Sequence, residues 1–368
     1  MIRLRRGIVE KILWSRKNIQ ALLVKVDSSF AKAINYPCLT GEAKEGDETL
    51  LNTTAVWKKL GTGGFHFVVA ILSIKEKDID VKGHLMKMRY TPLQIKVNSY
   101  EESRGINSLA FLNFKGMERC PVLLAELHSM VNPLVCVIKE KIPDARLVYI
   151  MTDSASLPMA LSYNIYQLKK NKLLLATITC GHAFGGDLET VNIFTALMAG
   201  FLEYSPHAMI IAPGPGIVGT GTKYGNTSLE QGENVNRINL LQGNPIFVPR
   251  VSFAEKRRRH YGISHHTLTC LTELSLTPAE VAFPVLEKEQ MSYLLGQIKR
   301  ANLFSKHKVY FLHVQKIIEK WKKRREAFTT MGRNIEEDPI FFEGVAAAGL
   351  RAVKLIEERG INTWRKKL

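Results

Sequence analysis

Apolar residues follow two different patterns along the chain. Up to about residue 95, short stretches of β-forming residues are separated by turn signals, and Leu22, Val24 and Val26 fall on one face of an extended segment. The expected strands here are 20–26, 30–34 and 65–70, with turns at 27–29, 41–47 and 61–64. Short strands at this spacing predict a small all-β, barrel-like domain over residues 1–95.

From about residue 118, the apolar stretches become uninterrupted and alternate with helical patterns. The expected strands are 121–127, 146–151, 173–179, 208–212 and 245–251, and the expected helices between them are 129–142, 156–170, 188–203 and 228–242. Strands that are apolar throughout and separated by helices are typical of a parallel sheet covered on both faces. The sequence therefore predicts a Rossmann-like α/β domain over residues 96–368.

The last hundred residues continue this pattern less regularly. Further strands are expected at 280–284 and 308–314, and helices at 315–328 and from Pro339 to near Gly360. Three helix starts have capping signals. Asp187 is expected to cap a helix that begins at Leu188, Ser228 and Gln231 have the spacing of a capping box, and Ser264 is an expected N-cap.

Polar or glycine-rich residues follow each expected strand. An open parallel sheet binds ligands at the carboxyl ends of its strands, where loops and helix N-termini meet. The segments at this edge are Glu126 with His128, 152–154, 180–187, 213–225, and Arg250 with 256–267. Their shared position predicts a polar site there.

The loop 213–225 holds five glycines in thirteen residues, together with two threonines and a lysine. Glycines let backbone N–H groups approach an anion, and the hydroxyls and the lysine add hydrogen bonds and charge. The predicted anion-binding residues are Gly216, Gly219, Thr220, Gly221, Thr222 and Lys223. The spacing matches neither a Walker A loop nor a dinucleotide fingerprint, and the alternative interpretation is a long structural loop.

Histidines and aspartates at the same edge suggest acid–base chemistry. His182, Asp187 and His265 are the candidate catalytic residues. The alternative is a tight turn at 181–187 in which Asp187 only caps the next helix. Arg333, in a charged loop before the last helix, either reaches an anionic ligand or belongs to a loop whose acidic residues cap that helix.

A divalent metal site is a further hypothesis. Suitable ligand types are His128, Asp153, His182, Asp187 and His265 or His266. Adjacent histidines point in different directions on a helix, so His265 and His266 are not expected to bind one metal together. The sequence identifies no cofactor.

The net charge of the chain suggests further kinds of binding partner. Lys and Arg number 51 and Asp and Glu 34, which gives a net charge of +17, concentrated at 256–260, 320–325 and 365–367. An anionic small molecule or a nucleic acid would fit this charge, although no ribonucleoprotein motif or zinc finger is present. Five scattered cysteines without a Cys-x-x-Cys motif predict reduced thiols and a cytoplasmic location. No apolar run is long enough to predict membrane insertion.

Several blocks together resemble a known family. They are Asn35–Pro37, Leu51–Ala55, Gly61–His66, Gly181–Glu189, Gly214–Thr222, Gly262–Thr267 and Thr330–Arg333. These blocks resemble an uncharacterised bacterial family, the domain of unknown function 3866, over nearly the whole chain. The resemblance implies one full-length bacterial protein. The family carries no assigned activity, so it transfers no catalytic residue.

The leading hypothesis is an α/β enzyme or binding protein for a phosphorylated or otherwise anionic small molecule. Its site would lie between the 181–187 turn, the 213–225 loop and the 262–267 helix start. A metal-dependent hydrolase and a non-enzymatic nucleic-acid-binding protein are the two alternatives.

Overall fold

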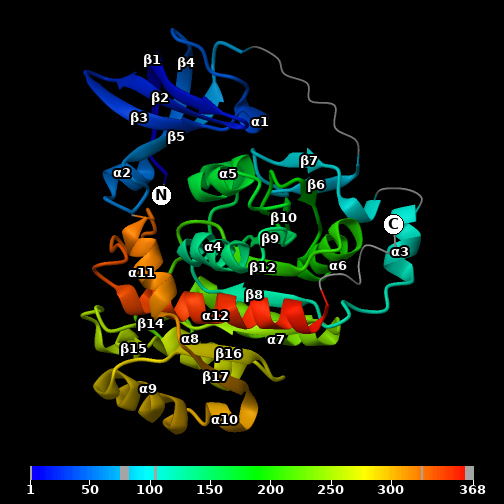
Figure 1. Ribbon diagram of the computed structural model, residues 1–368. Helices are drawn as coiled ribbons and strands as arrows, with labels where there is room; N and C mark the ends of the chain where they lie inside the picture. The colour runs from blue at the N-terminus through cyan, green and yellow to red at the C-terminus, as the bar shows by residue number, and fades with distance from the viewer. Residues whose placement is uncertain (1, 75–82, 103–105, 325, 361–368) are drawn as a thin grey trace. The chain divides into compact units, whose positions relative to one another are not determined.

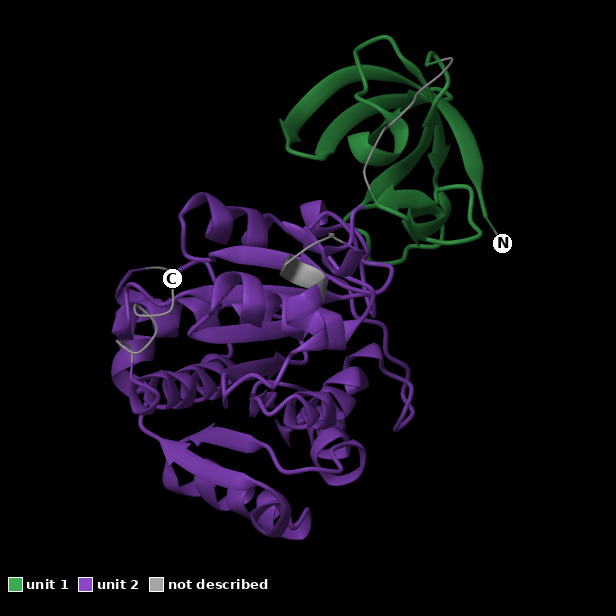
Figure 2. Cartoon of the chain, turned by 90° about the vertical axis from the view of Figure 1, so that its right-hand side faces the viewer, with its two compact units in different colours: residues 1–97 green, residues 98–368 purple. Residues whose placement is uncertain are grey.

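The computed structural model describes residues 2–74, 83–102, 106–324 and 326–360 (Figure 1). The chain forms two compact units, Met1–Val97 and Asn98–Leu368 (Figure 2). No helix in the described ranges has the length and apolar character needed to cross a membrane.

The first unit contains a closed five-stranded barrel with the strand order β1-β2-β3-β5-β4. Neighbouring strands are antiparallel except β3 and β5. Leu22 and Val24 point into the barrel core with Leu51 and Val68, which confirms the predicted alternation and the barrel. The strands are β1 (Leu4–Arg16), β2 (Ile19–Val26), β3 (Ser29–Asn35), β4 (Glu48–Asn52) and β5 (Phe65–Ile71), followed by the pair β6 (Leu85–Lys87) and β7 (Ile95–Val97). Two single turns, α1 (Pro37–Thr40) and α2 (Thr54–Trp57), lie between strands.

The second unit contains an eight-stranded sheet with the order β11-β10-β9-β12-β8-β13-β16-β17. Every neighbouring pair in it is parallel. The strands are β8 (Pro121–Ala125), β9 (Leu147–Thr152), β10 (Ala176–Thr179), β11 (Leu188–Glu189), β12 (Ala208–Pro213), β13 (Asn244–Val248), β16 (Glu280–Pro284) and β17 (Lys308–Leu312). The predicted strand from 245 to 251 ends early, and Val251–Ser252 instead forms β14, paired with β15 (Gly262–Ile263).

Helices cover both faces of this sheet. Successive residues of β8 show why: Leu123 packs into a core with α4, α5, α11 and α12, whereas Leu124 packs into a second core with α6, α7 and α9. A strand buried on both faces carries no polar alternation, which explains the uninterrupted apolar stretches. The longer helices are α4 (Val131–Lys141), α5 (Tyr163–Lys170), α6 (Ile193–Tyr204), α7 (Glu230–Leu240), α9 (Lys288–Arg300), α11 (Gln315–Lys323) and α12 (Pro339–Glu358). The shorter ones are α3 (Ile106–Leu112), α8 (His265–Thr269) and α10 (Leu303–Lys306). This arrangement confirms the Rossmann-like prediction.

Two predicted helix caps are wrong. The helix expected from Leu188 begins at Ile193, because residues 188–189 pair with β10 as strand β11. Asn192 caps that helix in a reciprocal capping box with Thr195. Asp187 instead accepts the Thr177 N–H at 2.8 Å and pairs with Lys169 at 2.7 Å.

The Ser228–Gln231 capping box is also absent. The Asn226 side chain accepts the Ser228 N–H and starts a short 3₁₀ turn ahead of α7, where no side-chain cap is present. The third cap is confirmed, since the Ser264 hydroxyl accepts the His266 N–H at 3.3 Å at the start of α8.

The strand order places a topological switch point beside β8. From β8 the chain crosses to β9 on one side, and from the neighbouring β13 it crosses to β16 on the other. Loops that leave in opposite directions open a crevice at the carboxyl ends of the two strands, which is where open α/β sheets bind ligands.

Candidate functional site

A buried polar network occupies the carboxyl ends of β8 and β13. Glu126 follows β8 and is 1% exposed, and Arg250 follows β13 and is 6% exposed. Thr267 joins them, because its hydroxyl donates to Glu126 and accepts the Arg250 backbone N–H at 3.2 Å. The second carboxylate oxygen of Glu126, Oε1, is buried and has no hydrogen-bond partner among the described residues.

Glu126 is poised to exchange a proton near neutral pH. Burial raises the pKa of its carboxyl group to about 7, although Thr267 and Arg250 act in the opposite direction. A carboxyl group with such a pKa is a candidate general acid or base.

Beside this network, one carboxylate faces three guanidinium groups. Glu255 Oε2 lies 2.7 Å from Arg257, 3.6 Å from Arg250 and 3.7 Å from Arg333. Hydrogen bonding to Arg257 lowers the pKa of Glu255 to about 2. Arg333 also pairs with buried Asp338 at 3.1 Å. Glu255 and Asp338 balance two of the three guanidinium charges, and Glu126 beside Arg250 is only partly ionised near pH 7, so the region keeps a positive charge.

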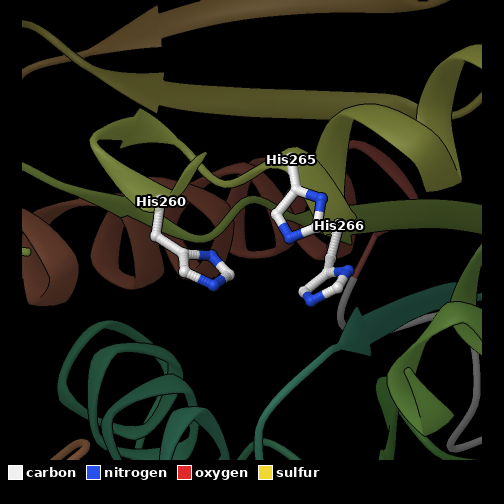
Figure 3. A group of neighbouring side chains, drawn as sticks. All are labelled: His260, His265 and His266. Carbon is white, nitrogen blue, oxygen red and sulfur yellow. The ribbon is translucent and has the colours of Figure 1, made fainter. Parts of the chain in front are cut away.

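Three histidines lie next to the arginines, and their rings face one another (Figure 3). One ring nitrogen from each of His260, His265 and His266 lies within 4.8 Å of the others. The expectation that His265 and His266 diverge is wrong, since their ring centroids are only 3.8 Å apart. They occupy the first turn of the short helix α8, and Gly262, with φ of 72°, turns the chain so that His260 comes back to meet them.

All three imidazoles are neutral at pH 7. Burial together with Arg250 and Arg257 lowers the pKa of His260 to about 3 and that of His266 to about 4. The pKa of His265 is lowered too, by burial and by neighbouring arginines. His265 Nε2 and His266 Nδ1 are buried without a hydrogen-bond partner in the described part of the chain.

Asn226 determines which nitrogen of His266 carries the proton. The Asn226 side-chain oxygen accepts from both the N–H and the hydroxyl of Ser228, so its NH₂ group faces His266 Nε2 at 3.1 Å. Since that NH₂ group donates to Nε2, neutral His266 carries its hydrogen on Nδ1. The unpartnered Nδ1 is therefore an N–H donor inside the cluster.

The glycine-rich loop meets the histidine cluster at its end. Asn226 directly follows the loop, and its side chain contacts His266 in the segment 262–267. Lys223 and Tyr224 are both bound to Glu273, and the Thr220 and Thr222 hydroxyls bond each other at 2.8 Å. The side chains of Thr220, Thr222 and Lys223, which were expected to hold an anion, thus contact neighbouring side chains.

The turn 181–187 is organised around other partners. The His182 backbone N–H donates to Asp153 at 2.8 Å, and Asp187 is held by Lys169 and Thr177. The proposed ligand set of His128, Asp153, His182, Asp187 and His266 is not gathered, because His260, His265 and His266 form the one candidate group of ligands in the described ranges. Cys180, at the start of this turn, is buried.

His128 lies in a separate pocket. It is 9% exposed, its Nδ1 lies 3.0 Å from the Pro213 carbonyl oxygen, and its Nε2 lies 2.7 Å from the Ser162 hydroxyl. Burial lowers the pKa of His128 to about 4. Both ring nitrogens are occupied, which argues against a role as a metal ligand.

The sequence indicates several residues of the site but not which of them contact one another. Glu126 and Arg250 are recognisable at the sheet edge and Arg333 in the charged loop before the last helix, whereas the pattern does not single out Glu255 and places His260 in a basic run. The available signal is a glutamate and a histidine that flank a run of four cations, between a strand end and the Ser264 helix cap.

The comparisons with known proteins place the chain in a family without adding a function. No curated protein matches it. A family model described as "Protein of unknown function (DUF3866)" matches residues 32–349. This match covers most of the chain and includes all the residues of the buried network and the histidine cluster, so the protein belongs to the DUF3866 family.

Proposed function

We propose that this protein binds a phosphorylated or carboxylated small molecule at the carboxyl ends of β8 and β13. The observation that carries the proposal is the sharing of Glu255 among Arg250, Arg257 and Arg333, next to three neutral imidazoles. An anion would supply the negative charge that these guanidinium groups lack, and charge-assisted hydrogen bonds of this kind are strong. The unused N–H of His266 adds a donor.

The same site has the groups needed for proton transfer. Glu126 is one hydrogen bond from Thr267, which in turn contacts the Arg250 backbone. A substrate held by Arg250 would therefore lie near a carboxyl group that exchanges its proton around pH 7. We propose Glu126 and His265 as the acid–base residues of an enzyme, in place of His182 and Asp187.

Thermal shift with inorganic phosphate, sugar phosphates, nucleotides and citrate, at low ionic strength, tests this proposal. A ligand at a hundred times its Kd stabilises the folded state by about 2.7 kcal/mol. We expect such a shift in the wild type and its loss in Arg250→Met, in which Glu255 keeps Arg257 and Arg333. Arg324→Ala, which removes an exposed arginine paired with Glu140, is the matched control. No shift with any anion, or an equal shift in Arg250→Met, would contradict the proposal.

A metal-dependent hydrolase is the second candidate, because three imidazoles that lie this close are ligands of the type that zinc binds. The adjacent arginines and the Asn226 donor oppose a cation there, so we place this function second. Elemental analysis of protein purified without an affinity tag separates the two. Stoichiometric zinc that is lost in His265→Ala would favour the hydrolase, and protein without metal that still binds phosphate would favour the anion site.

A further inference from the structure

A second candidate site lies in a pocket of about 440 Å³ at the carboxyl ends of β8 and β12 and the start of α5. Its wall is mostly apolar and includes Leu127, Leu161, Pro215, Ile217 and Met331. His128 and Ser162 also line this pocket. None of these residues belongs to the arginine and histidine cluster, so a role for this pocket is independent of the proposed function.

The hydrogen bonds of His128 define the direction of proton donation in the pocket. Its Nδ1 lies 3.0 Å from the Pro213 carbonyl oxygen, which can only accept, so Nδ1 carries the ring hydrogen. Nε2 is then an acceptor, and the Ser162 hydroxyl donates to it at 2.7 Å. The Tyr149 hydroxyl, 3.2 Å from the Ala212 carbonyl oxygen and 3.3 Å from His128 Nδ1, packs behind the ring. A hydroxyl, a base and a group that orients the base are the parts of an activated nucleophile.

The start of α5 also lines the pocket. Ser162 is the N-cap of this helix and accepts the Ile165 N–H at 3.1 Å. The next two residues, Tyr163 and Asn164, line the pocket. Backbone N–H groups at the first positions of a helix make no intrahelical hydrogen bond and point outward from a positive dipole end. N–H groups of this kind stabilise an oxyanion that forms within hydrogen-bond distance of them.

We propose that Ser162 is a nucleophile and His128 its general base, and that the pocket accepts a small uncharged ester with an apolar acyl group. Ser162 Oγ attacks the ester carbonyl carbon while its proton passes to His128 Nε2. The tetrahedral intermediate collapses, the C–O bond to the alcohol breaks, and His128 returns the proton to the leaving alcohol. Water then attacks the acyl-serine with His128 as base, which releases a carboxylic acid and restores the Ser162 hydroxyl.

A fluorophosphonate probe tests this assignment on the full chain. Serine attack on its phosphorus atom expels fluoride and leaves a stable adduct, which intact mass and peptide mapping locate. We expect one adduct per chain, on Ser162, and release of p-nitrophenol from p-nitrophenyl butyrate by the unlabelled protein. No adduct, or an adduct on another residue, overturns the proposal.

Variants separate this role from helix capping. Gln at position 128 can still donate to the Pro213 carbonyl but is no base, so His128→Gln should label more slowly by roughly 10²–10⁴-fold. Ser305→Ala is the control, since Ser305 is an exposed serine on α10, outside the pocket, whose hydroxyl donates to the Asn302 carbonyl oxygen; its labelling should equal that of the wild type. Unchanged labelling in a folded His128→Gln variant, verified by its melting curve, would overturn the role of the base.

Discussion

Glu126 is a buried side chain whose ionisation should affect stability near neutral pH. Burial raises its pKa from an ordinary 4.5 to about 7. Between these values the folded chain holds a proton that the unfolded chain has released, so stability is full below pH 4.5 and is lost progressively as the pH rises to about 7. A shift of this size corresponds to roughly 3 kcal/mol.

The variant Glu126→Gln removes that dependence, because its amide does not titrate. We expect the free energy of unfolding of the variant, relative to the wild type, to rise by on the order of 2–3 kcal/mol between pH 4.5 and pH 8. Urea denaturation at both pH values measures the difference. A difference that does not change with pH would show that Glu126 ionises normally in the folded protein.

At the residue scale, the sequence indicated the types of group at the sheet edge but not their partners. Asp187 has the spacing of a helix cap, yet Lys169 and Thr177 hold it because they come from neighbouring elements. His265 and His266 meet His260 only because Gly262 reverses the chain. Such contacts depend on tertiary geometry, which the pattern of residue types does not contain.

At the scale of elements, two glycines of the loop 213–225 differ in how closely other atoms surround them, and this difference can be tested. A Cβ atom on Gly214 would lie 2.5 Å from the Ser156 hydroxyl and 2.6 Å from its carbonyl oxygen. A Cβ atom on Gly221 would meet nothing within 4 Å. Gly214 is therefore required for close packing of two loops, whereas Gly221 is open to substitution.

We expect Gly214→Ala to destabilise the protein by about 1–3 kcal/mol, the range for overpacking, and Gly221→Ala to change stability by less than about 0.5 kcal/mol. Melting curves of the two variants provide the comparison. Equal effects of the two substitutions would show that the contact between Gly214 and Ser156 is not required for folding.

A buried ion pair joins α12 to β16. Arg351 Nε lies 2.5 Å and Nη2 3.2 Å from the two carboxylate oxygens of Glu280, and both side chains are less than a tenth exposed. Removing the cation alone leaves the buried Glu280 carboxylate without its counter-charge, so Arg351→Met should lower the free energy of unfolding by about 3–5 kcal/mol.

The double variant Glu280→Gln, Arg351→Met removes both charges and should therefore be more stable than Arg351→Met alone. Chemical denaturation of the two single variants and the double variant gives the coupling energy. Additive effects would mean that the two side chains contribute independently to stability, despite their contact.

Strands were the elements that the sequence predicted best, since burial on both faces leaves an uninterrupted apolar stretch. Glu280–Pro284 matches its prediction, and the other predicted strands differ mainly at their ends, whereas the barrel strands β1 and β4 and several short strands were not predicted. Helix starts were harder, because the edge pairing of Leu188–Glu189 with β10 takes residues away from the helical pattern that follows. Local propensity could not reveal that pairing.

At the scale of the whole molecule, the change of apolar pattern between about residues 95 and 118 indicated two architectures. The net charge of +17 could not be assigned to a partner in the same way. In the structure, part of that charge is bound internally: Glu140 pairs with Lys320 and Arg324 of the basic run at 320–325. Arg250 and Arg257 of the site face Glu255. The sequence does not show which cations form ion pairs within the protein and which remain available to a ligand, because these pairs form only in the folded chain.

The barrel of the first unit should fold on its own. Its core contains Val9, Leu22, Leu51 and Val68, all from residues 1–97, and a closed barrel leaves no strand edge unpaired. A domain of this length is also above the roughly 40 residues below which a chain needs disulfides or metals to fold. We therefore expect the fragment 1–97 to melt cooperatively by circular dichroism and to give dispersed amide resonances.

The substitution Leu22→Ala provides the matched test of that core, since Leu22 is fully buried in it. Its loss should cost about 2–5 kcal/mol and lower the melting temperature of the fragment sharply. Phe30→Ala, at a side chain that is 64% exposed on the neighbouring strand, should have little effect. A fragment that is unfolded without residues 98–368 would mean that the barrel depends on the second unit. A folded fragment would allow anion binding to be measured on each unit separately. Because the arginine and histidine cluster lies in the second unit, we expect residues 98–368 to bind the anion and the fragment 1–97 not to bind it.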